Sequence, residues 1–192
     1  MAERVDQNSS STHRGLAAGL VVMGAISRIL PHPPNMTSVG AMGLFAGAKL
    51  KTWQALSLPL ACMLITDPIL AWMHGYAAFR RDTLFIYASL MLNVLIGRWL
   101  VKNDNPARIA LAVVICSVQF FVVTNFSVWL LDGYYPHTWA GFVACYVAAI
   151  PFFRWTILGD LMYTGIFFGI YAFVSRKVLR PIPATANERA GA

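Results

Sequence analysis

Apolar residues occur along this chain in six main runs, which short polar or proline-rich segments separate. Most of these runs approach the roughly 20 residues that a helix needs to cross about 30 Å of hydrocarbon, and the first two are shorter. The pattern predicts transmembrane helices at residues 15–30, 38–48, 53–73, 83–101, 109–131 and 156–175. We therefore expect an all-α integral membrane protein built as a six-helix transmembrane bundle.

A further apolar segment, residues 138–153, precedes the last predicted span and is interrupted by Pro151. Charge decides its placement, because Lys and Arg accumulate in the cytoplasmic loops of membrane proteins. With six spans and a cytoplasmic N-terminus, 11 of the 15 basic residues fall on the cytoplasmic side and 4 outside. Counting residues 138–153 as a full span would move the basic cluster at residues 176–180 outside. We therefore predict a re-entrant or interfacial helix on the outer face, before the last span.

The same assignment divides the chain into three parts. Residues 1–14 are polar and are expected to form a disordered cytoplasmic N-terminus. Residues 15–178 form the six-span domain, and residues 179–192 a cytoplasmic tail. The first apolar run lacks a convincing small-x-small cleavage site, so we interpret it as a retained helix rather than a signal peptide.

Composition supports a membrane protein and limits its partners. The 192 residues are 58% hydrophobic and only 12% charged, whereas soluble domains average about 25% charged residues. The net charge of +7 needs no nucleic-acid partner, because cytoplasmic basic residues face the anionic lipid of the bilayer.

Small residues within the apolar runs predict close packing. Three G-x-x-x-G pairs allow helix backbones to approach in lipid, at Gly15/Gly19, Gly43/Gly47 and Gly165/Gly169. They fit packing within the bundle or docking of a partner subunit. The three cysteines lie inside apolar runs without paired spacing, so we predict neither a disulfide framework nor a metal site.

Polar residues inside the spans carry most of the functional information, because an ionisable group in hydrocarbon is costly and often functional. The predicted topology places these residues in the outer halves of the spans or in the outer loops, while the inner halves contain almost nothing ionisable. This one-sided distribution predicts a ligand pocket near the outer face. Its candidate residues are Arg28, His32, Asn35, Asp67, His74, Tyr87, Asn125, Trp129, Asp160 and Tyr163.

A structural interpretation of the charged members competes with the ligand pocket. Arg28 could pair with Asp67 or with Asp160 and lock the bundle, since charges inside membranes usually pair with one another. Asp160 could also act as a helix cap, because the N-terminal end of a helix favours negative charge. An ion pair alone, however, requires neither Tyr87 nor Asn125.

The stretch Pro31–Pro34 joins the first two predicted helices. Prolines restrict the backbone, so this stretch has little conformational entropy to lose. We expect it to hold Arg28, His32 and Asn35 over the mouth of the pocket as part of a gate.

Four stretches together carry a resemblance to a known family: SRILPHPPNMTSVGAMGLFAGA, LPLACMLITDPILAW, VVTNFSVWL and CYVAAIPFFRWTILGDLMYTGIFFG. They resemble a bacterial family of small, uncharacterised membrane proteins assigned to transport, over most of residues 26–169. That family is similar to the substrate-binding S components of energy-coupling-factor vitamin transporters, including solitary S components for vitamin B12.

The resemblance implies six helices, cytoplasmic termini, the bacterial inner membrane, a pocket near the outer face and a vitamin-like substrate. For a corrinoid it implies an axial donor to cobalt, for which the imidazoles of His32 or His74 are better placed than Cys62. One departure concerns the alanine face on the first helix that docks the energising coupling module in S components. Here Gly15 and Gly19 occupy the nearest equivalent positions.

Three classes of function remain open from the sequence. The first is a membrane-embedded protein that binds and translocates a small nutrient. The second is a structural or accessory subunit of a larger membrane complex, which the close-packing glycines favour. A membrane enzyme is the third, but the chain has no nucleophile elbow, no H-E-x-x-H and no paired-aspartate motif. We expect no catalytic activity and no resident cofactor.

Overall fold

The computed structural model describes residues 2–33 and 35–177, and these residues are almost entirely helical. The six helices of this region confirm the predicted all-α bundle. They are α1 (Ala2–Ser27), α2 (Val39–Lys49), α3 (Thr52–His74), α4 (Thr83–Leu100), α5 (Pro106–Leu131) and α6 (Trp139–Lys177).

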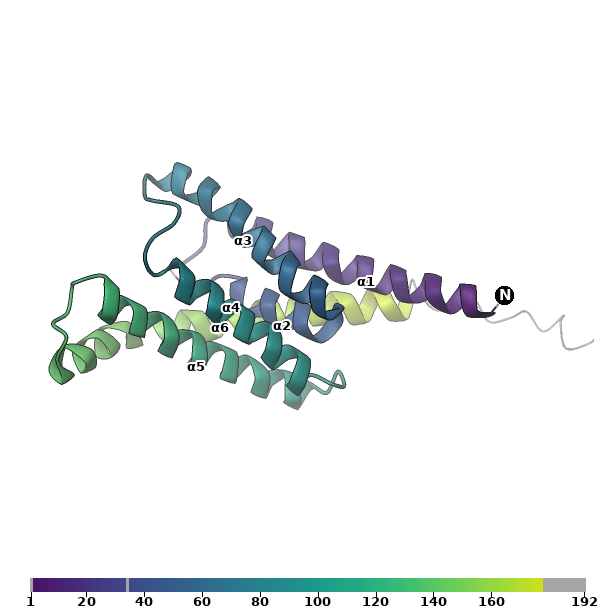
Figure 1. Ribbon diagram of the computed structural model, residues 1–192. Helices are drawn as coiled ribbons and strands as arrows, with labels where there is room; N and C mark the ends of the chain where they lie inside the picture. The colour runs from purple at the N-terminus through teal and green to yellow at the C-terminus, as the bar shows by residue number, and fades with distance from the viewer. Residues whose placement is uncertain (1, 34, 178–192) are drawn as a thin grey trace, which may run out of the picture.

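The helices run alternately in opposite directions (Figure 1). One end of the bundle contains the loop after α1, the α3–α4 loop and the α5–α6 loop, and we call it the corner end. It lies on the left in Figure 1, while the N-terminal end of α1 lies on the right. We call the right-hand end the opposite end.

The short helix α2 occupies the centre of the bundle. It packs against all five other helices, most extensively against α4, and most of its side chains are buried. Its 11 residues rise only about 16 Å, roughly half of a bilayer core. The sequence predicted a span here, whereas the structure has a central half-length helix, which the corner loop (residues 28–33 and 35–37) connects to α1.

Glycines permit the contact between α2 and α4. A Cβ atom on Gly47 would overlap the carbonyl oxygen of Val94, and one on Gly97 would overlap that of Leu44. The two backbones therefore touch directly, as predicted for Gly43 and Gly47. By contrast, no atom of the described residues lies within 4 Å of a Cβ placed on Gly15, Gly19, Gly165 or Gly169.

The last helix corrects the prediction for residues 138–153. Rather than forming a separate re-entrant or interfacial helix, this segment continues without a break into the last predicted span as the 39-residue α6. Pro151 lies inside the helix and removes only its own N–H bond. In membrane helices that loss is tolerated, because neighbouring groups can compensate for it.

The first helix is also longer than predicted, because it begins at Ala2 and includes most of the expected disordered segment, residues 1–14. The predicted tail, residues 179–192, lies outside the described residues. Four described helices, α3 to α6, are long and apolar enough to cross a membrane. Large apolar side chains such as Ile65, Leu111 and Phe173 are exposed on their outward surfaces, as lipid contact requires.

Candidate binding site at the corner end

Arg28 lies directly after the last residue of α1 and forms the centre of a polar cluster. Its Nη2 lies 2.7 Å from Oδ1 of Asp67 on α3, and the two side chains are only 12% and 16% exposed. Its Nη1 donates to the hydroxyl of Thr66 and lies 3.0 Å from Sδ of Met63. Tyr87 on α4 donates its hydroxyl to Oδ2 of Asp67 at 2.7 Å. The cluster therefore joins the end of α1 to α3 and α4, and it confirms the predicted pairing of Arg28 with Asp67.

The residues next to Asp67 in the sequence affect the local structure of α3. Pro68 follows it and cannot donate to the carbonyl four residues earlier, which loosens α3 at this turn. Thr66 turns its hydroxyl back to the carbonyl of Cys62 at 2.9 Å, a bond that satisfies its polar group in the bundle interior.

The corner loop is closed at its base by hydroxyl groups. Ser38, fully buried before α2, donates to the carbonyl of Gly24 on α1 at 2.6 Å. Ser27 donates to the Ser38 hydroxyl at 3.0 Å, so the two ends of the loop meet. Within the loop Met36 N–H donates to the Pro33 carbonyl at 3.0 Å, and Asn35 has a φ of 64°. Asparagine tolerates this left-handed conformation better than most residues.

Asp160 occupies a different environment on α6. It is 4% exposed and accepts a 2.7 Å hydrogen bond from the hydroxyl of Ser117 on α5. It also accepts a hydrogen bond from the backbone N–H of Ala41 in the first turn of α2. A Cβ atom on Gly40 would overlap its carboxylate. Asp160 therefore does not pair with Arg28 but caps the N-terminal end of α2 from another helix.

Three neighbouring cavities surround the corner loop. The largest, the corner cavity, holds about 550 Å³ between the corner loop and the end of α3. The inner cavity holds about 270 Å³ and has Arg28, Asn35 and Asp160 in its wall. The lateral cavity holds about 220 Å³ and is lined by Asn35 and Asn125. Arg28 and Thr37 border the first two cavities, and Asn35 borders the last two, so one loop lines all three.

Both histidines of the prediction line the corner cavity. His32 is exposed on the corner loop. His74 at the end of α3 uses Nδ1 in a 2.9 Å contact with the Leu70 carbonyl and stacks on Tyr76 at 6.1 Å. The Nε2 atom of His74 takes no part in that contact, so it can bind a molecule in the corner cavity.

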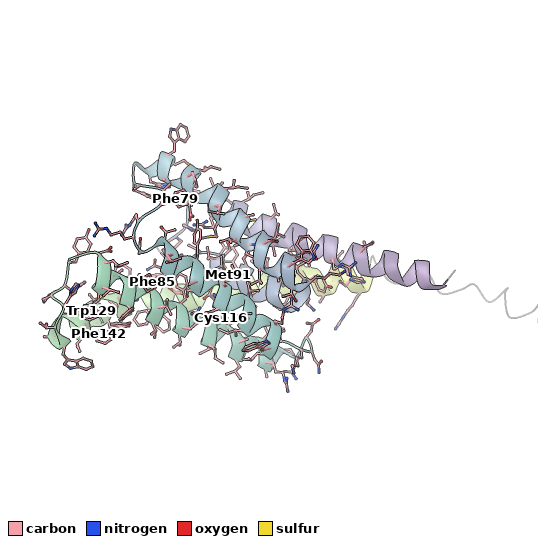
Figure 2. All side chains as sticks on the ribbon, viewed as in Figure 1. Phe79, Phe85, Met91, Cys116, Trp129 and Phe142 are labelled. Carbon is pink, nitrogen blue, oxygen red and sulfur yellow. The ribbon has the colours of Figure 1, made fainter. Side chains whose placement is uncertain are left out.

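Four predicted residues line none of the three cavities: Asp67 and Tyr87, which belong to the Arg28 cluster, and Trp129 and Tyr163. Trp129 belongs to an aromatic cluster at the corner end, with its ring 5.4 Å from the rings of His137 and Phe142. Figure 2 shows Trp129 beside Phe142, where α5 and α6 meet. Tyr163 packs against the core of the bundle, with its ring 6.3 Å from that of Phe167. Both contribute to packing in this conformation.

Sequence reasoning missed a buried amide network between α4 and α5. Gln119 bonds both to Ser89 and, at 2.6 Å, to Oδ1 of Asn93, which is fully buried. Among the residues that the structure describes, the Asn93 Nδ2 group has no hydrogen-bond partner. In the sequence, Gln119 and Asn93 are single amide residues within apolar runs. Such a pattern marks a buried polar group but does not identify its hydrogen-bond partners.

The site provides recognition groups rather than a metal centre. Within residues 2–33 and 35–177, no three His, Cys, Asp or Glu side chains gather closely enough to hold a metal ion. Its groups include a guanidinium, carboxyl groups, imidazoles, amides and hydroxyls around water-sized space. Such a set can orient a small polar molecule by hydrogen bonds.

A second concave surface lies toward the opposite end, between α5 and α6. It holds about 410 Å³, and its lining includes Ile109, Val113, Gly165 and Phe168, with Arg176 among its polar members. This surface is separate from the three cavities at the corner loop.

Comparisons with curated proteins and with solved structures give no match. A family model covers nearly the whole chain, from residue 8 to residue 185, and therefore includes the corner loop, the Arg28–Asp67 cluster and Asp160. The protein belongs to the family of unknown function DUF6580.

Proposed function

We propose that this protein binds a small polar or amphipathic nutrient at the corner end of the bundle and translocates it across the membrane. The observation that supports this proposal is the set of three adjoining cavities around one loop. Their walls contain Arg28, His32, His74, Asn35 and Asn125. Small-molecule sites commonly occupy about 300–1,000 Å³ and combine apolar walls with a few polar groups. The corner cavity falls within that range.

The central half-length helix supports translocation in particular. In many transporters, substrate sites lie near the middle of the bilayer at the ends of discontinuous helices. Here α2 begins beside the inner cavity, and Gly40 contributes to its wall. The irregular backbone of the corner loop fits the same view, because non-helical backbone at membrane depth requires a cavity or a protein neighbour.

Cavity size narrows the class of substrate. An intact corrinoid is larger than the corner cavity in this conformation, so a vitamin or nutrient of one or two rings fits it better. The two imidazoles remain the natural donors if a metal-containing ligand binds after the loop opens.

We further propose the bacterial inner membrane as the location, with both termini in the cytoplasm and the corner end outside. The uneven distribution of basic residues supports this orientation. Cysteine substitution at Gln7 and Gly133, followed by labelling with an impermeant reagent on intact cells, tests it. We expect labelling at position 133 only, and labelling at position 7 would reverse the orientation.

Native mass spectrometry of the detergent-purified protein, followed by calorimetry with a panel of vitamins, tests the function. We expect one small molecule to bind. Asn125→Ala should weaken its binding about tenfold, whereas Arg108→Ala, an exposed change at the opposite end, should leave it intact. If no molecule binds, or if a molecule binds equally well to Asn125→Ala, the proposal is wrong.

A second candidate function is that of a subunit in a larger membrane complex, either with an energising coupling module or with other membrane subunits. The specific observation is that Gly15/Gly19 on α1 and Gly165/Gly169 on α6 have free space above them. Small residues of this kind allow a helix from another chain to approach. Obligatory co-purification of other subunits, with loss of their binding on Gly19→Leu, would favour this function.

A further inference from the structure

Asp160 lies in the wall of the inner cavity, and the proposed function assigns it no role of its own. It is 4% exposed, and among the described residues no cationic group lies within ion-pair distance of it. Its hydrogen-bond partners among the described residues are neutral: the Ser117 hydroxyl and the Ala41 backbone N–H. This differs from the carboxyl group of Asp67, which has a guanidinium at 2.7 Å.

Titratable groups that face Asp160 are few. Arg28 shares the inner cavity but is occupied by Asp67. The thiol of Cys116 faces it from α5, and Tyr163 follows it on α6 itself. On the sides of α2, α3 and α4, its neighbours around the inner cavity are Gly40, Met63 and Ile86, which carry no ionisable group.

A buried carboxylate without a cation beside it costs free energy, and protonation removes that cost. Burial without a cation favours the neutral form of an acid, while hydrogen bonds to the carboxylate favour the charged form. Here burial without a cation favours the neutral form, while two donors and the N-terminal end of α2 favour the charged form. The inner cavity borders the carboxyl group and is large enough to hold water, which could carry a proton to it.

We propose that Asp160 binds and releases a proton and thereby controls how firmly the first turn of α2 is held. The ionised group accepts a charge-assisted hydrogen bond from Ala41, whereas the protonated group accepts a weaker, neutral one. The reaction is a simple transfer of H⁺ between water in the inner cavity and a carboxylate oxygen. The ligand of this site is the proton. The proposal rests on the proposed function only where it links proton binding to the binding of a nutrient.

The contacts of α2 show how the proton would reach the binding site. Gly40 and Ala41 form the first turn of α2, and Ser38 precedes that turn. Ser38 in turn holds the base of the corner loop through Gly24 and Ser27. A weaker hold on the first turn of α2 therefore loosens the loop that lines all three cavities. Proton binding and nutrient binding would then be linked through one segment.

Infrared difference spectroscopy across a pH titration tests the proton site in the full-length protein, without any small molecule. We expect a carboxylic-acid band that disappears as the pH rises and is absent in Asp160→Asn. The control Asp104→Asn changes an exposed carboxyl group at the opposite end and should keep the band. Absence of the band, or its survival in Asp160→Asn, would overturn the proposal.

A milder variant keeps the test valid if Asp160→Asn fails to fold. Ser117→Ala removes one donor to the carboxylate, so the infrared midpoint should move to higher pH by about one unit. No movement of the midpoint would contradict the assignment of the band to Asp160.

Hydrogen exchange measures the effect on α2. We expect the amides of residues 39–42 in Asp160→Asn to exchange several-fold faster than wild type at high pH, with the difference closing at low pH. Equal protection at every pH would overturn the coupling to α2. These measurements need no nutrient, so their failure leaves the proposed function standing. Failure to find any ligand leaves the infrared result standing.

Discussion

The two aspartates inside the bundle show two ways of holding a carboxyl group in a membrane protein. Asp67 lies among a guanidinium and two hydroxyl-bearing side chains, at the junction of α1, α3 and α4. Asp160 lies among a hydroxyl, a backbone N–H and a glycine, at the junction of α2, α5 and α6. The first charge is neutralised by another charge, and the second only by dipoles.

This difference separates a structural role from a responsive one. In the Arg28–Asp67 pair each charge compensates the other in a region of low dielectric, so removing either partner leaves the other unpaired. A carboxyl group held by neutral donors can gain a proton without leaving a cation unpaired. The Arg28–Asp67 cluster therefore fixes the relative positions of three helices, whereas Asp160 can change its charge.

The largest expected effect comes from breaking the ion pair. Arg28→Gln should lower the free energy of unfolding by roughly 3–5 kcal/mol, because Asp67 is left charged and partly buried. The double variant with Asp67→Asn should recover a substantial part of this loss. Unfolding in detergent with SDS measures all three variants, and strict additivity of the two changes would contradict direct pairing.

A smaller effect should follow from crowding Asp160. Gly40→Ala places a methyl group against its carboxylate, which should cost about 1–3 kcal/mol. Gly165→Ala is the matched control on α6, since the space above Gly165 is free, and it should change stability little. Combining Gly40→Ala with Asp160→Ala should relieve the clash. Equal effects of the two glycine variants would show that Asp160 does not lie against Gly40.

Removing a hydroxyl from the ion-pair cluster should cost less. Tyr87→Phe deletes one donor to Asp67, and hydrogen bonds to charged groups contribute about 1.5 kcal/mol or more. Tyr134→Phe, which changes a tyrosine that is 79% exposed, is the control and should leave the unfolding midpoint unchanged.

The smallest effect on stability is expected at the lateral cavity. Within the described part of the chain, the Asn125 side chain donates only to the Phe121 carbonyl of its own helix, at 2.8 Å. Asn125→Ala should therefore alter stability by less than about 0.5 kcal/mol. The same variant should weaken nutrient binding, as calorimetry would show. A large loss of stability would assign Asn125 to the structure instead.

The sequence predicted the helices and one of the two carboxyl environments. An aspartate partner for Arg28, either Asp67 or Asp160, could be predicted, because a charge at that depth needs an opposite charge and few were available. The environment of Asp160 was not predictable in this way. Its partners include a backbone N–H and a serine hydroxyl, and neither group is distinctive in a sequence.

Two further differences have physical causes. The prediction of a separate helix at residues 138–153 followed from the distribution of basic residues, but the helix continues through Pro151 into the last span as α6. The central position of α2 depended on direct backbone contact with α4 through Gly47 and Gly97. The G-x-x-x-G spacing predicted close approach but could not say which pair would be used, and two of three pairs remain open.

The length of α6 has a mechanical consequence. Its 39 residues rise about 58 Å, nearly twice the roughly 30 Å thickness of a hydrocarbon core. Such a helix must tilt or project from the bilayer, and the balance depends on bilayer thickness. Because Asp160 lies near the middle of this rod, we expect lipids with longer or shorter acyl chains to shift its position against α2. The membrane itself would then act as a regulator of the cavities.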